Sequence, residues 1–239
     1  MAELKSEGNP QLDALMNAIM RAEDAKAIKL LAEHPELAQQ CLKVGATRQT
    51  AAQYFFPEIT HYLSSGDSAL HAAAAAYNVA LCTHLLDNGA DISARNRLGA
   101  QPLHYAMAGG PATPTWDPAK QSKCISFLIS KGADPNSHSK HGAAPLHQAA
   151  RHRCALAAAT LLQCGANVRL KNLQGSTPLH LAVQNTGRGG SGSDEAKEQQ
   201  KEIIELLLKH GARASDKDAN GKTVMQCVKT DWIKELLEG

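Results

Sequence analysis

Residues 175–180 read Gly-Ser-Thr-Pro-Leu-His, and this phrase decides the fold because partial copies of it return along the chain. The copies are Ala69-Leu70-His71, Pro102-Leu103-His104 and Pro145-Leu146-His147. A second phrase, Gly-Ala followed by a polar residue, comes after each of them and begins at Gly89, Gly132, Gly165 and Gly211. The histidines are 33, 43 and 33 residues apart. The chain therefore repeats a 33-residue unit, and two copies carry insertions of about 10 and 13 residues.

Each unit predicts a turn followed by two helices. A glycine such as Gly142 or Gly175 precedes the first helix, and in three units that helix begins with proline, whose missing N–H is harmless there. The second helix ends in a Leu-Leu pair before a capping glycine, as at Leu161-Leu162 and Gly165. One pair of short helices cannot bury enough apolar surface alone, so the units must stack. The predicted fold is an all-α repeat solenoid of helix pairs joined by short β-hairpin-like turns.

The composition excludes several classes of protein. Among 239 residues, 25 are Lys or Arg and 23 are Asp or Glu, and this near-balance argues against a nucleic-acid binder. Aromatic residues make up only 4%, which predicts a core of Ala, Leu, Ile and Val. The six cysteines form no Cys-x-x-Cys pair, so we interpret them as core residues of a reducing compartment. Without an apolar run or a secretory signal, we expect a cytoplasmic protein that does not enter a membrane.

The two recurring phrases resemble those of the ankyrin repeat over roughly Gly66 to Leu237. The complete Thr-Pro-Leu-His phrase occurs only at Thr177–His180, and the threonine is replaced in the other units by Ser68, Gln101 and Ala144. The resemblance implies that this Thr and His brace the turn by local hydrogen bonds, so we expect a weaker brace in the two middle units. The stretch Thr-Gly-Arg-Gly-Gly-Ser-Gly-Ser at 186–193 is similar to an insertion in bacterial ankyrin-repeat proteins, which brings no assigned activity.

We expect two parts in the chain. An N-terminal helical cap occupies 1–65, with a degenerate repeat over Leu12 to His34 and further helix between Glu36 and Leu63. The repeats fill the rest of the chain, at 66–98, 99–141, 142–174 and 175–220, and end in a terminal cap at 221–239. The insertions lie near 109–121 and 185–199, between the first and second helix of their units.

The chain has eleven histidines, which could indicate a metal site, but the spacing of the four histidines in the repeats argues against one. His71, His104, His147 and His180 fall one per unit and are therefore about 10 Å apart, the packing distance of helices. Side chains at that separation cannot share one metal ion. We interpret them as hydrogen-bonded structural residues. No catalytic motif was found either, so we expect a non-enzymatic protein without metal or cofactor.

The resemblance implies that recognition uses the hairpin tips and the exposed side of the first helices. Those positions form a mixed basic and apolar concave strip, suited to a segment of another protein with some acidic character. The strip consists of Arg97, Leu98, Tyr105, Lys140, His141, Gln148, Leu173, Gln174 and Leu181. We expect a monomer, because caps at both ends disfavour end-to-end stacking.

An alternative function places a small anionic ligand, such as a phosphate, at the insertion edge. Glycine-rich backbone can turn several N–H groups toward one anion, and arginines can hold it by paired hydrogen bonds. The residues of this second hypothesis are Trp116, Arg151, His152, Arg153, Thr186, Gly187, Arg188, Gly189 and Gly190. The same composition is also typical of a plain flexible linker. A structural spacer without any ligand is the third possibility.

Overall fold

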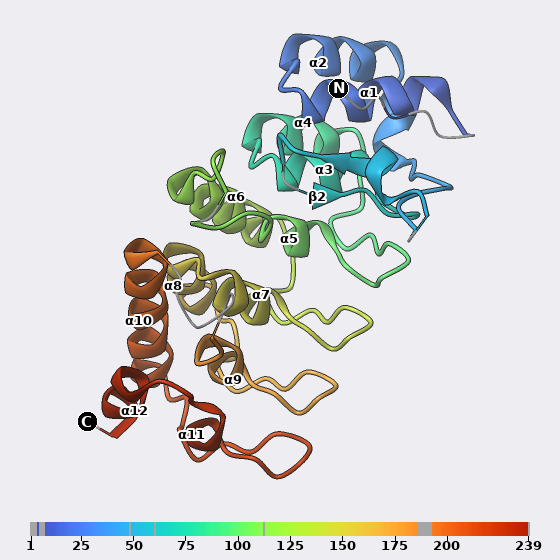
Figure 1. The fold of residues 1–239 in the computed structure, drawn as a ribbon. Helices are drawn as coiled ribbons and strands as arrows, with labels where there is room; N and C mark the ends of the chain where they lie inside the picture. Colours follow the sequence, from blue (N-terminus) through green and yellow to red (C-terminus); the bar gives the residue numbers. More distant parts are fainter. Residues whose placement is uncertain are drawn as a thin grey trace. The chain divides into compact units, whose positions relative to one another are not determined.

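The structure is a computed structural model that describes residues 4, 8–47, 49–59, 61–111, 113–185 and 193–238. The chain folds into two compact units. Unit 1 consists of Met1–Gly109 with Ala119–Asp134, and unit 2 consists of Gly110–Pro118 with Pro135–Gly239. Figure 1 colours the elements along the sequence.

Unit 1 begins with a helix pair that packs on the first repeat. Helix α1 contacts α2 and α3, and α3 contacts α4 and α5. The helices of unit 1 are α1 (Pro10–Met20), α2 (Asp24–Glu33), α3 (Ala69–Ala75), α4 (Val79–Asp87), α5 (Pro102–Tyr105) and α6 (Pro118–Ser130). Asn9 caps α1 by accepting a hydrogen bond from the Gln11 N–H, and Pro10 follows as the first helical residue.

The segment between Glu36 and Leu63 differs from the sequence prediction of further α-helix. It contains the 3₁₀ helices η1 (Pro35–Gln39) and η2 (Ala51–Tyr54) and an antiparallel hairpin of β1 (Phe55–Phe56) and β2 (His61–Tyr62). Its backbone groups are used by non-local partners: the Ala46 N–H donates to Leu63 O, and the Leu42 N–H donates to Asp67 O. This pairing competes with an i to i−4 ladder, so no long helix forms.

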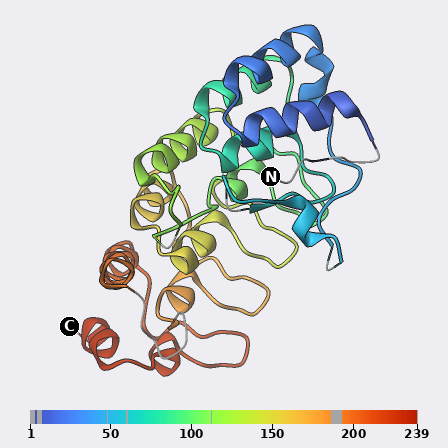
Figure 2. The same cartoon turned by 45° about the horizontal axis from the view of Figure 1, so that its top comes forward.

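Unit 2 holds the later repeats and the C-terminal elements. Helix α7 contacts α8 and α9, and α10 contacts the same two helices. The helices are α7 (Pro145–His152), α8 (Ala155–Gln163), α9 (Pro178–Ala182), α10 (Asp194–Lys209), α11 (Val224–Cys227) and α12 (Asp231–Glu238). In Figures 1 and 2 the hairpins that precede α7, α9 and α11 all extend to the same side of this unit. The first insertion, near 109–121, extends into the start of α6, and the second, near 185–199, extends into the start of α10.

Successive hairpins are joined by a backbone hydrogen bond at the same place in the repeat. The Leu173 N–H donates to His141 O at 3.2 Å, and the Ala219 N–H donates to Gln174 O at 3.0 Å. In unit 1 the Arg97 N–H donates to Ser65 O at 2.9 Å in the same way. The hairpins of each unit therefore form a row in which backbone meets backbone.

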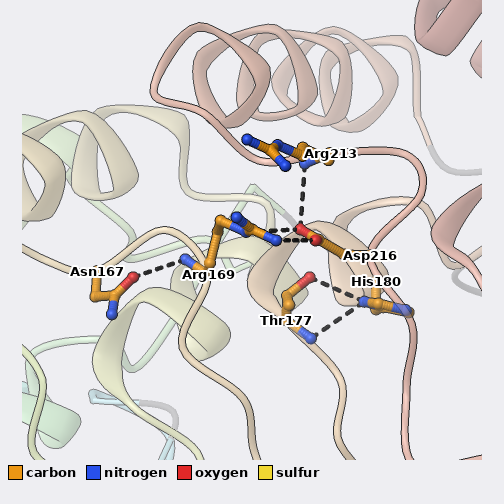
Figure 3. A network of polar contacts seen from close by, with 6 residues as sticks. All are labelled: Asn167, Arg169, Thr177, His180, Arg213 and Asp216. Carbon is orange, nitrogen blue, oxygen red and sulfur yellow. Dashed lines mark hydrogen bonds and ion pairs between the residues drawn. The ribbon is translucent and has the colours of Figure 1, made fainter.

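A second connection runs between the loops that follow the second helices of unit 2, as Figure 3 shows. Arg169 donates through Nη2 to Asp216 Oδ1 at 2.5 Å and through Nε to Asp216 Oδ2 at 3.2 Å. The Arg213 N–H also donates to Asp216, and the Arg169 N–H donates to Asn167 Oδ1. Because Asp216 is buried and doubly paired, this ion pair fixes one loop against the next more firmly than an exposed pair would.

The core confirms the prediction of small aliphatic packing. Alanine and leucine dominate it, and the whole run Ala72–Ala75 is buried in α3. Only some of the cysteines lie in this core. Cys82, Cys124 and Cys154 are buried, whereas Cys41 is exposed and its backbone forms an isolated β-bridge with Ser68. Within the part of the chain that the structure describes, no helix is both long enough and apolar enough to cross a bilayer.

Candidate partner-binding groove

The repeat histidines have the structural role that the sequence predicted. In all four repeats the Nδ1 atom of the histidine accepts the backbone N–H of the residue three positions earlier, at 3.1–3.2 Å. Because Nδ1 is an acceptor, the proton lies on Nε2, which faces Ala100 O from His71, Ser176 O from His147 and Lys222 O from His180. Each of these three rings thus joins its helix to the next hairpin.

The environment of these rings keeps them neutral. Burial lowers the pKa of His71 to about 4, and burial also lowers the pKa of His147 and of His180. The brace differs between repeats in the way expected. The hydroxyls of Ser68 and Thr177 add a second bond to the histidine Nδ1, whereas Gln101 and Ala144 have no hydroxyl to make it. Among the described residues, no group of three or more His, Cys, Asp or Glu is placed to hold a metal ion.

The hairpin tips are fixed by side chains at their bases. Asn172 Oδ1 accepts the N–H groups of Gln174 and Ser176, and Asp218 and Asn96 form the same pair of bonds in their own hairpins. Asn96, Asn172 and Asp218 thus each bond the backbone of their own turn. A polar side chain that accepts two backbone N–H groups holds the loop in one conformation.

A hollow of about 500 Å³ lies in unit 2 on the side of α7 and α9 that carries the hairpins. It combines residues from both sequence hypotheses. His141, Gln148, Gln174 and Leu181 come from the predicted concave strip, and Arg151 and His152 come from the predicted insertion edge. We call this hollow the groove. Gln148 and Leu181 occupy the same position in their repeats, directly after the bracing histidine, and so line it side by side.

The side chains that line the groove favour an occupant with negative charge. No acidic side chain is among its lining residues, whereas Arg151, His141 and His152 bring cationic or hydrogen-donating groups. The Gln148 Oε1 atom is buried and has no hydrogen-bond partner in the described structure. A buried acceptor without a partner is costly, so an occupant that supplies an N–H there would be stabilised.

The remaining residues of the predicted strip lie outside this groove. Lys140 is exposed, and Leu173 is 69% exposed at its hairpin tip. In unit 1, Leu98 is 40% exposed, and the exposed Arg97 donates through its guanidinium to Ala46 O. These side chains are accessible, but the structure does not bring them into a hollow.

Tyr105 differs most from its predicted place on an open face. It occupies the same position in its repeat as Gln148 and Leu181, yet only 2% of it is exposed. The His61 ring from β2 packs on the Tyr105 ring in a T-shaped contact, with ring centroids 4.3 Å apart. The Tyr105 hydroxyl donates to Asp67 Oδ2 at 2.6 Å and accepts from Asn96 Nδ2. In unit 1 the chain's own hairpin thus covers the position that lines the groove in unit 2.

Asp67, the acceptor for Tyr105, is a buried carboxyl that no sequence pattern predicts. It also accepts the Ser64 N–H at 2.6 Å and Asn96 Nδ2 at 2.9 Å. Burial raises the pKa of Asp67 to about 7, although these donors act in the opposite direction. Burial likewise raises the pKa of Tyr105. This network fixes the turn before α3.

The residues of the predicted insertion site are divided by the structure. Arg151 and His152 line the groove, Arg153 is buried at the end of α7, and Trp116 is half-buried in the first insertion. The other members, Thr186, Gly187, Arg188, Gly189 and Gly190, lie outside the described residues.

Comparisons with known proteins agree with this architecture. A family model described as ankyrin repeats in three copies matches residues 118–192, and the single ankyrin repeat model matches residues 65–97 and 174–219. Together these matches cover more than half of the chain. No curated protein matches it. With its stacked helix pairs, its row of hairpins and these matches, the chain belongs to the ankyrin repeat family.

Proposed function

We propose that this protein is a non-enzymatic interaction module that binds an acidic segment of a partner protein in the groove of unit 2. Ankyrin repeats generally serve as modules for protein–protein interaction. The single observation that carries the proposal is the groove itself, a hollow of about 500 Å³ with Arg151 and two histidines in its wall and no carboxylate. An extended acidic segment fits both its charge and its open form.

The rigidity of the groove supports this proposal. Its walls are α7, α9 and two hairpins, which the His147 brace and the Asn172 bonds hold in place before any partner arrives. A preformed surface loses little conformational entropy on binding, so more of the contact energy remains as affinity. Leu181 provides apolar contact, and the unpartnered Gln148 Oε1 accepts a backbone N–H of the bound segment.

The experiment compares two charge reversals within unit 2. Arg151→Glu changes a side chain that lines the groove, and Lys140→Glu changes an exposed side chain outside it. A panel of fluorescent acidic, neutral and basic peptides is titrated against the full chain and both variants. We expect preference for the acidic set, and a loss of about tenfold or more in affinity for Arg151→Glu alone.

Two results would count against the proposal. One is a panel in which acidic peptides bind no better than basic ones. The other is an equal loss for Arg151→Glu and Lys140→Glu, because a general change of net charge would then explain the effect. Circular dichroism of each variant verifies that the fold is retained.

A further inference from the structure

Two histidines outside the repeat phrase line the groove of unit 2. His141 lies at the tip of the hairpin before α7, and His152 is the last residue of α7. Both residues are exposed, whereas His147 of the same helix is buried and braces the turn. Histidine is the side chain that changes its charge between pH 5 and 8, and an exposed ring does so without disturbing a core. The wall of the groove therefore holds two rings whose charge responds to pH.

The repeat itself does not require a histidine at either of these positions. The corresponding positions of the other hairpins and helices hold small, polar or apolar residues. At the position of His141 they are Ser65, Leu98, Gln174 and Asn220, and at the position of His152 they are Ala76, Gly109 and Asn185. Because the same hairpins and helices form around such different side chains, stacking does not account for the two rings. What His141 and His152 share is the groove that they line.

The groove has no negative charge of its own to pair with these rings. The charged or titratable residues that line it are all basic, namely His141, His147, Arg151 and His152. Their neighbours in the sequence, Lys140 and Arg153, are basic as well. The other charges that act on the bracing rings of His147 and His180 come from residues outside the lining, namely His138, Lys171, Asp216 and Asp218. At the described lining of the groove, negative charge therefore arrives with an occupant.

An acidic occupant changes the charge balance at both exposed rings. Opposite charge within about 4–6 Å favours the charged form of a titratable group. A carboxylate bound between His141 and His152 therefore favours protonated rings, and binding takes up protons from solution. Linkage is reciprocal, so a fall in pH strengthens binding by the same coupling with which binding promotes protonation. Arg151 keeps its charge throughout this range and supplies an attraction that does not vary with pH.

We propose that the groove of unit 2 binds its acidic segment together with protons on His141 and His152, so that affinity rises as the pH falls from 7.5 to 5.5. This inference rests on the proposed function, because it concerns the same groove and the same class of partner. His147 takes no part in the proton uptake. Burial lowers its pKa, and its Nε2 faces Ser176 O in the brace.

The test measures the Kd of a fluorescent, blocked peptide with four aspartates spaced by serines, at pH 5.5, 6.5 and 7.5 and constant ionic strength. Aspartate has an ordinary pKa of about 3.9, so the peptide keeps its charge over this range. We expect the Kd of the full chain to fall about tenfold from pH 7.5 to pH 5.5, a coupling of ordinary size. The double variant His141→Gln/His152→Gln should lose this fall. His84→Gln makes the same change at an exposed histidine of α4, outside the groove, and should keep it.

Three results would overturn the inference. An equal Kd of the full chain at pH 5.5 and 7.5 would refute it and leave the proposed function standing. An equal fall of Kd in the double variant would attribute the effect to the net charge of the whole chain. Acidic peptides that bind no better than basic ones at any of the three pH values would refute both proposals.

A second measurement decides the question if the double variant does not fold. The ring-proton NMR signals of the wild-type histidines are recorded at pH 6.5 with and without the aspartate peptide. The signals of His141 and His152 should move toward those of the protonated ring when the peptide binds, and the signal of His84 should stay in place. Unchanged signals of His141 and His152 at saturating peptide would refute proton uptake by these rings.

Discussion

Replacement of Gly175 by alanine tests whether the row of hairpins is held by close backbone contact. Gly175 has φ 71°, and a Cβ there would lie 2.3 Å from Ala219 N of the next hairpin. A left-handed residue with a Cβ costs about 1–2 kcal/mol. The Cβ also forces the next hairpin away and breaks the Ala219 N–H to Gln174 O bond, which contributes about 0.5–1.5 kcal/mol. We therefore expect Gly175→Ala to lower the free energy of unfolding by about 1.5–3.5 kcal/mol.

Gly221 supplies the matched control. It occupies the same position in the following hairpin, with φ 76°, but a Cβ there would meet nothing within 4 Å. Gly221→Ala should therefore lose only the conformational part, about 1–2 kcal/mol. Urea unfolding followed by circular dichroism measures both variants at the same temperature. Equal losses for the two variants would refute the reasoning, because the next hairpin would then impose no steric constraint.

Two further predictions concern buried groups whose pKa values move in opposite directions. The folded-state pKa of Asp67, about 7, lies above its ordinary value of 3.8, so the folded state holds a proton that the unfolded chain releases. Stability from this group is present below pH 4 and is lost as pH rises toward 7, by on the order of 4 kcal/mol. The stability advantage of the wild type over Asp67→Asn should fall across this window in urea unfolding, and a pH-independent difference would contradict it. The folded-state pKa of His71, about 4, lies below 6.5, so its contribution is present above pH 6.5 and is lost on acidification toward pH 4. His71→Gln should reduce this acid loss, because glutamine does not take up a proton. The glutamine can still make the capping bond, since Gln226 Oε1 accepts the Thr223 N–H as His71 Nδ1 accepts that of Ser68. Thermal unfolding at pH 4.5 and 7.5 checks this prediction, and an unchanged acid loss would count against the assignment.

Much of the repeat could be predicted because its signals are local. Proline at the first helical position, the histidine three residues after the cap and Asn172 or Asp218 before the tip act on groups a few residues away. The brace of His147 therefore followed from the sequence, and the turn bonds of Asn172 are of the same local kind. Helix α10 begins with a local signal of the same kind, because the hydroxyl of Ser193 before it accepts the Ala196 N–H.

The segment from Glu36 to Leu63 could not be predicted in the same way. Its composition is compatible with helix, but its backbone pairs with residues 17 to 25 positions further along, as in the Ala46 to Leu63 and Leu42 to Asp67 bonds. Such pairs depend on where α3 and the first hairpin place their own backbone groups. No periodicity within the segment encodes that position.

The candidate site shows most clearly which features the sequence determines and which only the tertiary structure decides. The sequence alone determined that Tyr105, Gln148 and Leu181 share one register, because the histidine before each of them sets the phase of its helix. Only the tertiary structure decided that Gln148 and Leu181 line a groove while His61 covers Tyr105. Register is a property of a few consecutive residues. Exposure depends on which distant segment packs over them, and the contact between His61 and Tyr105 joins residues 44 positions apart, of which His61 lies outside the repeats.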